Sequence, residues 1–186
     1  FGSAGDAAAV VSSVIGLARA LPTIPAAPLT TRSDIAVAQA DWWIVNTTAG
    51  SSGLAIQAGG TVDAPGARHE IVAGSMASRA AATMVVAEDE ALAATPADKW
   101  FLSLFGVDRD TFKRQPATVR VVCEGDCGGR LQDAVANNPG RPLWVSGDLV
   151  IGGDITLGSE TEPVLIVAEG NITLGSPGIR IHGLVH

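Results

Sequence analysis

The chain has 186 residues, a formal net charge of −7 and only two lysines, Lys99 and Lys113. This charge balance argues against a nucleic-acid partner, because phosphate contacts need clustered lysine and arginine side chains. Apolar residues make up 47% of the chain but aromatic residues only 4%, which favours close-packed small side chains over a large aromatic core.

The N-terminal segment predicts a helix from Asp6 to Leu21, with Asp6 as its N-cap and apolar residues at helical spacing. Pro22, Pro25 and Pro28 then predict an extended connector. The apolar stretch before Pro22 is too short and too interrupted to span a membrane.

The middle of the chain mixes helix and strand signals. We expect a strand at 42–45, short strands and loops over 46–70, and either a strand or a helix at 79–87. A helix is expected from Thr95 to Phe105 because Thr-Pro-Ala-Asp is a typical helix start. A second short helix is expected at 109–115.

The two cysteines, Cys123 and Cys127, follow an expected strand at 118–123 and precede an expected helix at 130–137. Their three-residue spacing with a central glycine suits a small disulfide loop. The alternatives are a thioredoxin-like pair, which needs two intervening residues, and half of a zinc site. A disulfide predicts an extracytoplasmic location.

The C-terminal region nearly repeats itself. Gly153–Ser159 returns as Gly170–Ser176, and a weaker copy at 147–150 precedes both. Each copy is a short alternating strand bounded by turn residues, which predicts strands stacked in coils as in a β-solenoid. We expect Ile155 and Ile172 to point into a shared apolar interior.

The last expected coil lies near 181–185, where its backbone groups would lack a neighbour and need a cap or a partner strand.

Together these signals predict an α+β protein. Residues 1–31 form an N-terminal helix and connector, 32–140 a mixed α/β body, and 141–186 a β-solenoid-like segment.

No catalytic motif is present in the sequence, so we expect a protein that is not an enzyme and that uses no metal or cofactor. The candidates for an interaction surface are Trp42, Trp144 and His182. For Trp42 the competing interpretation is core packing. For His182 it is an outward position on a coil that carries no chemistry.

Several segments of the chain resemble the extracytoplasmic part of PilX-type proteins of type IV pilus assembly, a group of minor-pilin-like proteins. The resembling segments are 32–43, 100–106, 115–116, 123–127, 143–149, 163–167 and 181–185. The resemblance implies a structural subunit at the periplasm or in a surface pilus, with other pilins or minor pilins as partners. It also implies membrane anchoring through a hydrophobic N-terminal helix, which this sequence does not contain.

Two other functions remain open at this point. One is a surface module that recognises a carbohydrate or a host protein, with Trp42 or Trp144 contributing. The other is a bactofilin-like polymer-forming scaffold in the cytoplasm, where both cysteines would be free thiols.

Overall fold

The structure is a computed structural model that describes residues 22–23, 25–36, 43–46, 54–63, 68–71, 84–176 and 178–186. These residues form both helices and strands, so the predicted α+β class is confirmed. The helix expected at 6–21 lies outside the described residues, and so does Trp42.

The first seven strands form what we call the N-terminal stack. They are β1 (Leu29–Thr31), β2 (Ile35–Ala36), β3 (Trp43–Asn46), β4 (Ile56–Ala58), β5 (Val62–Asp63), β6 (Arg68–Ile71) and β7 (Val85–Val86). All of their pairings are parallel, in the orders β1-β4-β7, β2-β5 and β3-β6. The strands β1, β2 and β3 therefore form one coil, and β4, β5 and β6 form the next coil beside it.

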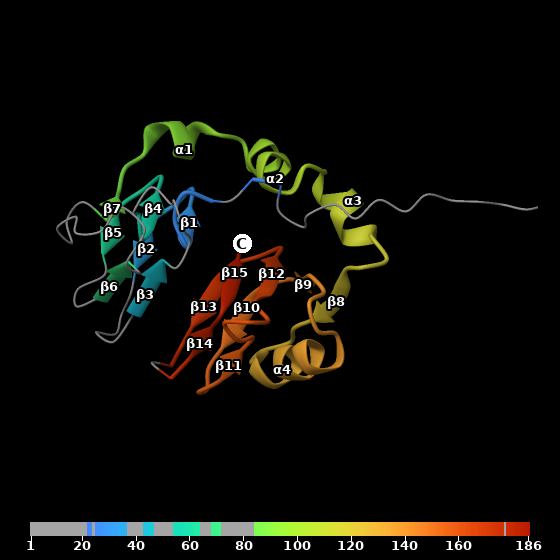
Figure 1. Ribbon diagram of the computed structural model, residues 1–186. Coiled ribbons are helices and arrows are strands. Elements are labelled where there is room, and N and C mark those ends of the chain that lie inside the picture. Colours follow the sequence, from blue (N-terminus) through green and yellow to red (C-terminus); the bar gives the residue numbers. More distant parts are fainter. Residues whose placement is uncertain are drawn as a thin grey trace, which may run out of the picture.

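Three helices lead from this stack to the C-terminal part: α1 (Glu90–Ala94), α2 (Ala97–Phe105) and α3 (Arg109–Arg114). They form an arch over the molecule (Figure 1). The helices expected at 95–105 and 109–115 are confirmed as α2 and α3. Helix α1 was not expected from the sequence; its N-cap Asp89 accepts a hydrogen bond from the backbone N–H of Leu92.

The remaining elements form what we call the C-terminal stack. They are β8 (Val119–Val122), α4 (Gly128–Asn137), β9 (Leu143–Ser146), β10 (Leu149–Ile151), β11 (Thr156–Leu157), β12 (Val164–Ala168), β13 (Ile172–Leu174), β14 (Arg180–Ile181) and β15 (Gly183–Val185). Its strands are again all parallel, in the orders β15-β12-β9-β8, β10-β13 and β11-β14. Because β8 pairs with β9, this sheet crosses the domain boundary expected at residue 140.

Aliphatic side chains from successive strands fill the interior of the C-terminal stack. The most deeply buried are Leu131, Leu143, Val145, Leu149, Ile151, Leu157 and Ile166. A second cluster lies outside the sheet, where aromatic residues of α2 and α3 pack on Trp144 of β9 and Val167 of β12.

The two clearest sequence copies are not register partners. The strand Ile172–Leu174 lies beside Leu149–Ile151, which belongs to the weaker copy, and not beside the residues after Gly153. The segment after Gly153 instead lies beside β14, through the register pair Leu157 and Ile181. The copies mark turns of the same kind, at different places around the coil.

Candidate interaction surface

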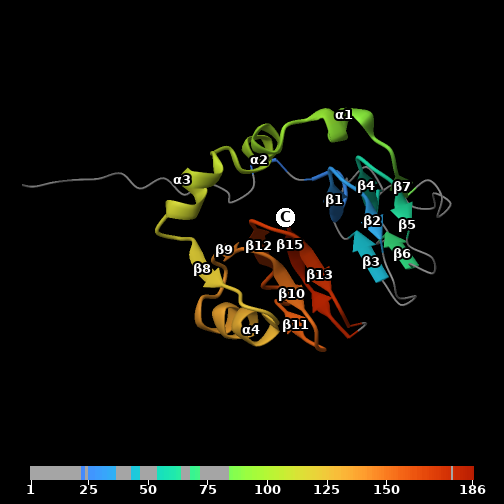
Figure 2. The same cartoon turned by 180° about the vertical axis from the view of Figure 1, so that it is seen from behind.

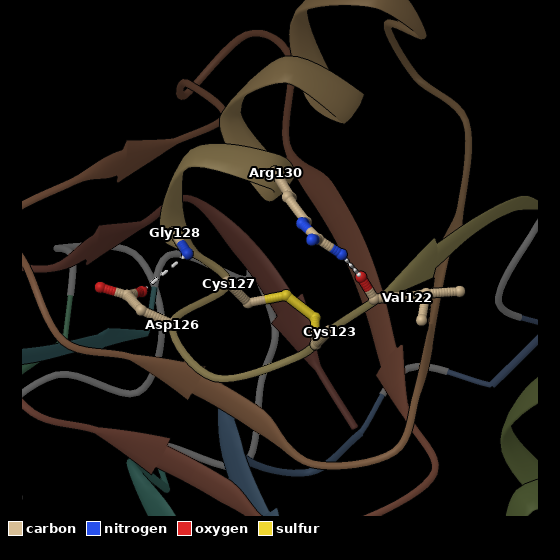
Figure 3. The surroundings of a disulfide bond; sticks show 6 residues. All are labelled: Val122, Cys123, Asp126, Cys127, Gly128 and Arg130. Atoms are coloured by element: carbon tan, nitrogen blue, oxygen red, sulfur yellow. Dashed lines mark hydrogen bonds between the residues drawn. A yellow bond between two sulfur atoms is a disulfide. The ribbon is translucent and has the colours of Figure 1, made fainter.

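One end of the C-terminal stack is closed by the disulfide loop and α4. Cys123 and Cys127 form a disulfide with their Cα atoms 5.4 Å apart (Figure 3). The loop pairs with the next coil, since the backbone N–H of Cys127 donates to the carbonyl of Val150 at 2.7 Å. The chain then enters α4, whose Leu131 is fully buried in the core of the stack. Helix α4 therefore covers the apolar core at this end, and among the described strands β8 pairs only with β9.

Side chains of the loop hold the start of α4 in place. Asp126 Oδ1 accepts from the backbone N–H of Gly128 at 2.9 Å, and Arg130 Nη1 donates to the carbonyl of Val122 at 2.6 Å (Figure 3). Backbone hydrogen bonds from Gly128 and Gly152 lower the pKa of Asp126. The Asp126 contact satisfies a backbone N–H that the start of α4 leaves free, and the Arg130 contact satisfies a carbonyl of β8.

An aspartate fixes the turn between β9 and β10. Asp148 Oδ1 accepts from the backbone N–H of Asn171 in the next coil at 2.8 Å. The N–H of Gly170 donates to the carbonyl of Gly147 at 3.0 Å. A Cβ atom on Gly170 would lie 2.2 Å from Asp148 Oδ1, so only glycine fits beside this carboxylate.

The N-terminal stack repeats this turn contact by contact. Asp34 Oδ1 accepts from the backbone N–H of Thr61 at 2.7 Å, and the N–H of Gly60 donates to the carbonyl of Ser33 at 3.2 Å. A Cβ atom on Gly60 would lie 2.3 Å from Asp34 Oδ1. The backbone and hydroxyl hydrogen bonds from Thr61 lower the pKa of Asp34. Both stacks are therefore built on one plan, in which Asp34 corresponds to Asp148.

The opposite end of the C-terminal stack is open within the described residues. Its last coil consists of β13, β14 and β15, and each of these strands pairs on one side only. Ile172 of β13 is 42% exposed, and Leu174, Ile181 and Val185 are only partly buried. This open end presents aliphatic side chains beside unpaired strand edges, which is a typical arrangement for strand addition.

The expected surface residues take different positions in the structure. Trp144 is a core residue with 2% exposure, because Phe101 and Phe112 cover it at ring-centroid distances of 6.2 and 6.1 Å. His182 is partly buried and its backbone carbonyl accepts from the N–H of Val164 at 2.8 Å. Neither residue belongs to β13, β14 or β15, although His182 lies between the last two.

Sequence reasoning did not anticipate the role of His186. Its ring lies 4.7 Å from that of Trp100 and 5.4 Å from those of Phe101 and Phe105. Burial among these rings, with a smaller effect of Arg109, lowers the pKa of His186 to about 4. The neutral imidazole of His186, which follows β15, thus packs the last coil of the C-terminal stack against α2.

A charged pair lies at the outer face of the same sheet. Lys113 of α3 donates to Glu169, which follows β12, at 2.5 Å, and its Nζ lies 5.6 Å from the centre of the Trp144 ring. The hydrogen bond from Lys113 lowers the pKa of Glu169. This contact fastens α3 to the sheet.

The described residues contain no cluster of three or more histidine, cysteine, aspartate or glutamate side chains arranged to hold a metal ion. In the same residues, no helix has the length and apolar character that crossing a bilayer requires. No protein-family model, curated protein or solved structure matches the chain.

Proposed function

We propose that the chain is a structural, minor-pilin-like subunit that acts in the assembly, initiation or tip of a type IV pilus, and that its C-terminal strands form a β-solenoid. The proposal rests on one observation above all. Successive parallel strands bury aliphatic rows between them, and the stack has one closed and one open end. Such a body suits contacts with other subunits, since an open strand edge pairs readily with another chain.

An extracytoplasmic location is part of the proposal. It is supported by the Cys123–Cys127 disulfide, because such bonds persist in oxidising compartments and are rare in the cytoplasm. The same bond counts against a cytoplasmic, bactofilin-like scaffold. In the proposed full-length protein, a hydrophobic N-terminal helix outside this sequence supplies the membrane anchor, and the helix expected at 6–21 follows it.

The decisive experiment follows the protein in the bacterium that encodes it. Sheared pili and membrane, periplasmic and cytoplasmic fractions are probed with an antibody raised against residues 84–186. Deleting the gene should lower the number of surface pili, and re-expression of the parent should restore it. A cytoplasmic protein, or normal piliation after deletion, would contradict the proposal.

Two further measurements separate the alternatives. Quantifying thiols in protein isolated under acid quench should find none in an extracytoplasmic subunit and two in a cytoplasmic scaffold. A glycan array should be negative for a pilin-like subunit, and specific glycan binding would favour the surface recognition module instead.

A further inference from the structure

The chain contains two sequences of the form Asn-x-Thr, which is the acceptor pattern for N-linked glycosylation. The first begins at Asn46, and its threonine lies outside the described residues. The second is Asn171-Ile172-Thr173, at the start of β13, where all three residues are described and exposed. Because an acceptor has to be reached from outside the fold, the surroundings of the second sequence decide whether it fits this role.

The side chains of Asn171 and Thr173 point away from the interior of the C-terminal stack. Successive side chains of a strand alternate between its two faces. Ile172 is the register partner of Leu149, a fully buried core residue, so Ile172 takes the inner face. Asn171 and Thr173 therefore share the outer face, and the amide and the hydroxyl of the acceptor pattern lie on the same side of the strand.

The backbone of Asn171 is fixed while its side-chain amide is available. Its N–H donates to Asp148 Oδ1 at 2.8 Å, and its carbonyl accepts from the N–H of Leu149 at 2.8 Å. The side-chain Nδ2 lies 3.5 Å from the same Asp148 oxygen, which is beyond the usual range of a hydrogen bond. Attaching a group to Nδ2 therefore gives up one weak contact and leaves the turn intact.

The strand that carries this sequence is open on one side. β13 pairs with β10 and with no other described strand. An enzyme that binds an extended segment can use such an unpaired edge, because its backbone groups are free. The other clear copy, at 154–156, has Asp154 in place of the asparagine, and its strand β11 contacts both α4 and β14.

An acidic residue lies two positions before the acceptor. This residue is Glu169, and bacterial oligosaccharyltransferases need a carboxylate at that position. Lys113 is paired with Glu169, but both side chains are partly exposed. Exposed pairs of this kind contribute little, so an enzyme can displace Lys113 from the carboxylate.

We propose that Asn171 is an N-glycosylation site and that the substrate is an oligosaccharide carried on a lipid pyrophosphate. Asn171 Nδ2 attacks C1 of the first sugar, the bond from C1 to the pyrophosphate oxygen breaks, and the lipid pyrophosphate leaves. The amide gives one proton to the transferase, and nothing is oxidised or reduced. Glycosylated asparagines of this pattern lie on surfaces of secreted proteins, so the modification rests on the proposed extracytoplasmic location.

The modification leaves the strand edges of the last coil free. The glycan is attached to a side chain on the outer face, whereas the unpaired N–H and C=O groups of β13 lie in the plane of its sheet. These edges therefore remain available to another subunit.

Mass spectrometry of the native protein tests the assignment. The protein is isolated from the pilus, periplasmic and cytoplasmic fractions of the bacterium that encodes it, and the peptide that contains Asn171 is analysed for a glycan. The parent should carry a glycan at Asn171. Asn171→Gln and Thr173→Val should each lower occupancy at least tenfold, whereas Thr173→Ser should retain it. Circular dichroism should show the parent fold in all three variants, because the backbone contact with Asp148 is kept.

Two further variants test the selection of this asparagine. Glu169→Gln should lower occupancy at least tenfold, and Lys113→Met should not lower it. Asp154→Asn completes the acceptor pattern in the other copy, where residue 152 is glycine and the strand contacts α4, and the new site should stay unmodified.

The outcomes separate the glycan from the location. An unmodified Asn171 in protein from the pilus or periplasmic fraction overturns the glycosylation and leaves the proposed location standing. Protein found only in the cytoplasm overturns both. A glycan that persists in Asn171→Gln is attached elsewhere and overturns the assignment to this residue.

Discussion

Leu149 and Ile172 are direct register partners on adjacent parallel strands, yet Leu149 is fully buried and Ile172 is 42% exposed. In-register parallel strands direct paired side chains to the same face of the sheet. The difference in exposure therefore comes from position along the stack, because the disulfide loop and α4 cover Leu149 and none of the described residues covers Ile172 to the same extent.

This difference predicts unequal costs of truncation. Leu149→Ala should lower the free energy of unfolding by about 2–5 kcal/mol, because it leaves a cavity in a sealed core. Ile172→Ala should cost about 1 kcal/mol, since much of its side chain already contacts water. Urea unfolding followed by circular dichroism measures both values. Equal losses would contradict an open end at Ile172.

The turn glycines offer a second, matched comparison. Gly170→Ala should destabilise the protein by about 1–3 kcal/mol, because the new methyl group would collide with the Asp148 carboxylate. Gly153→Ala is the control, since a Cβ atom there meets nothing within 4 Å. That variant should be neutral or slightly stabilising. Thermal unfolding of the two proteins decides the matter, and equal melting temperatures would refute the tight turn.

Removing the disulfide should loosen the closed end first. The variant Cys123→Ala/Cys127→Ala should lose about 2 kcal/mol, the value expected for a short crosslinked loop. Amide hydrogen exchange should rise in α4 more than in β12, because the loop leads directly into that helix. Uniform exchange across both elements would mean that the loop has no special role at this end.

Acid should weaken the protein through His186. Its pKa is about 4 in the fold against an ordinary value of 6.5, so the unfolded chain binds the extra proton between these values. Stability from this group is complete above pH 6.5 and falls by roughly 2–3 kcal/mol as the pH drops to 4.5. His186→Phe keeps an aromatic ring in place and removes the titration. Denaturant midpoints measured across this pH window should slope less for the variant, and parallel slopes would exclude the role of His186.

The elements that depend on local signals could be predicted from the sequence. The helices α2 and α3 and the disulfide loop each depend on residues close together in the chain. The expected cap of α2 was wrong in detail, because its N-cap is Pro96, without a side-chain hydrogen bond, and Thr95 ends α1. Such contacts are set by backbone geometry that a short segment determines by itself.

The register of the coils could not be predicted in the same way. The stronger similarity, between Gly153–Ser159 and Gly170–Ser176, reflects turns of the same chemistry, since Asp154 accepts from Ser176 much as Asp148 accepts from Asn171. Coil length depends on how many residues each loop holds, and loops tolerate wide variation in length. The true partner of Ile172 is therefore the less similar Leu149.

Short strands were expected at 42–45 and over 46–70, but their stacking in the N-terminal stack was missed for a related reason. Its strands are two to four residues long, and the turn residues Asp34 and Gly60 are separated by loops without any repeat in sequence. Only the three-dimensional contacts show that Asp34 and Asp148 have the same role, since each accepts a hydrogen bond from a backbone N–H of the next coil. The burial of Trp144 was missed because Phe101 and Phe112, which cover it, lie 43 and 32 residues earlier in the chain.

Helix α4 gives the C-terminal stack a direction. Leu131 fills the interior beside β8, so helix α4 covers the apolar core at that end, whereas Ile172 stays 42% exposed at the other. The two ends of the stack therefore differ in the apolar surface that they offer to a partner.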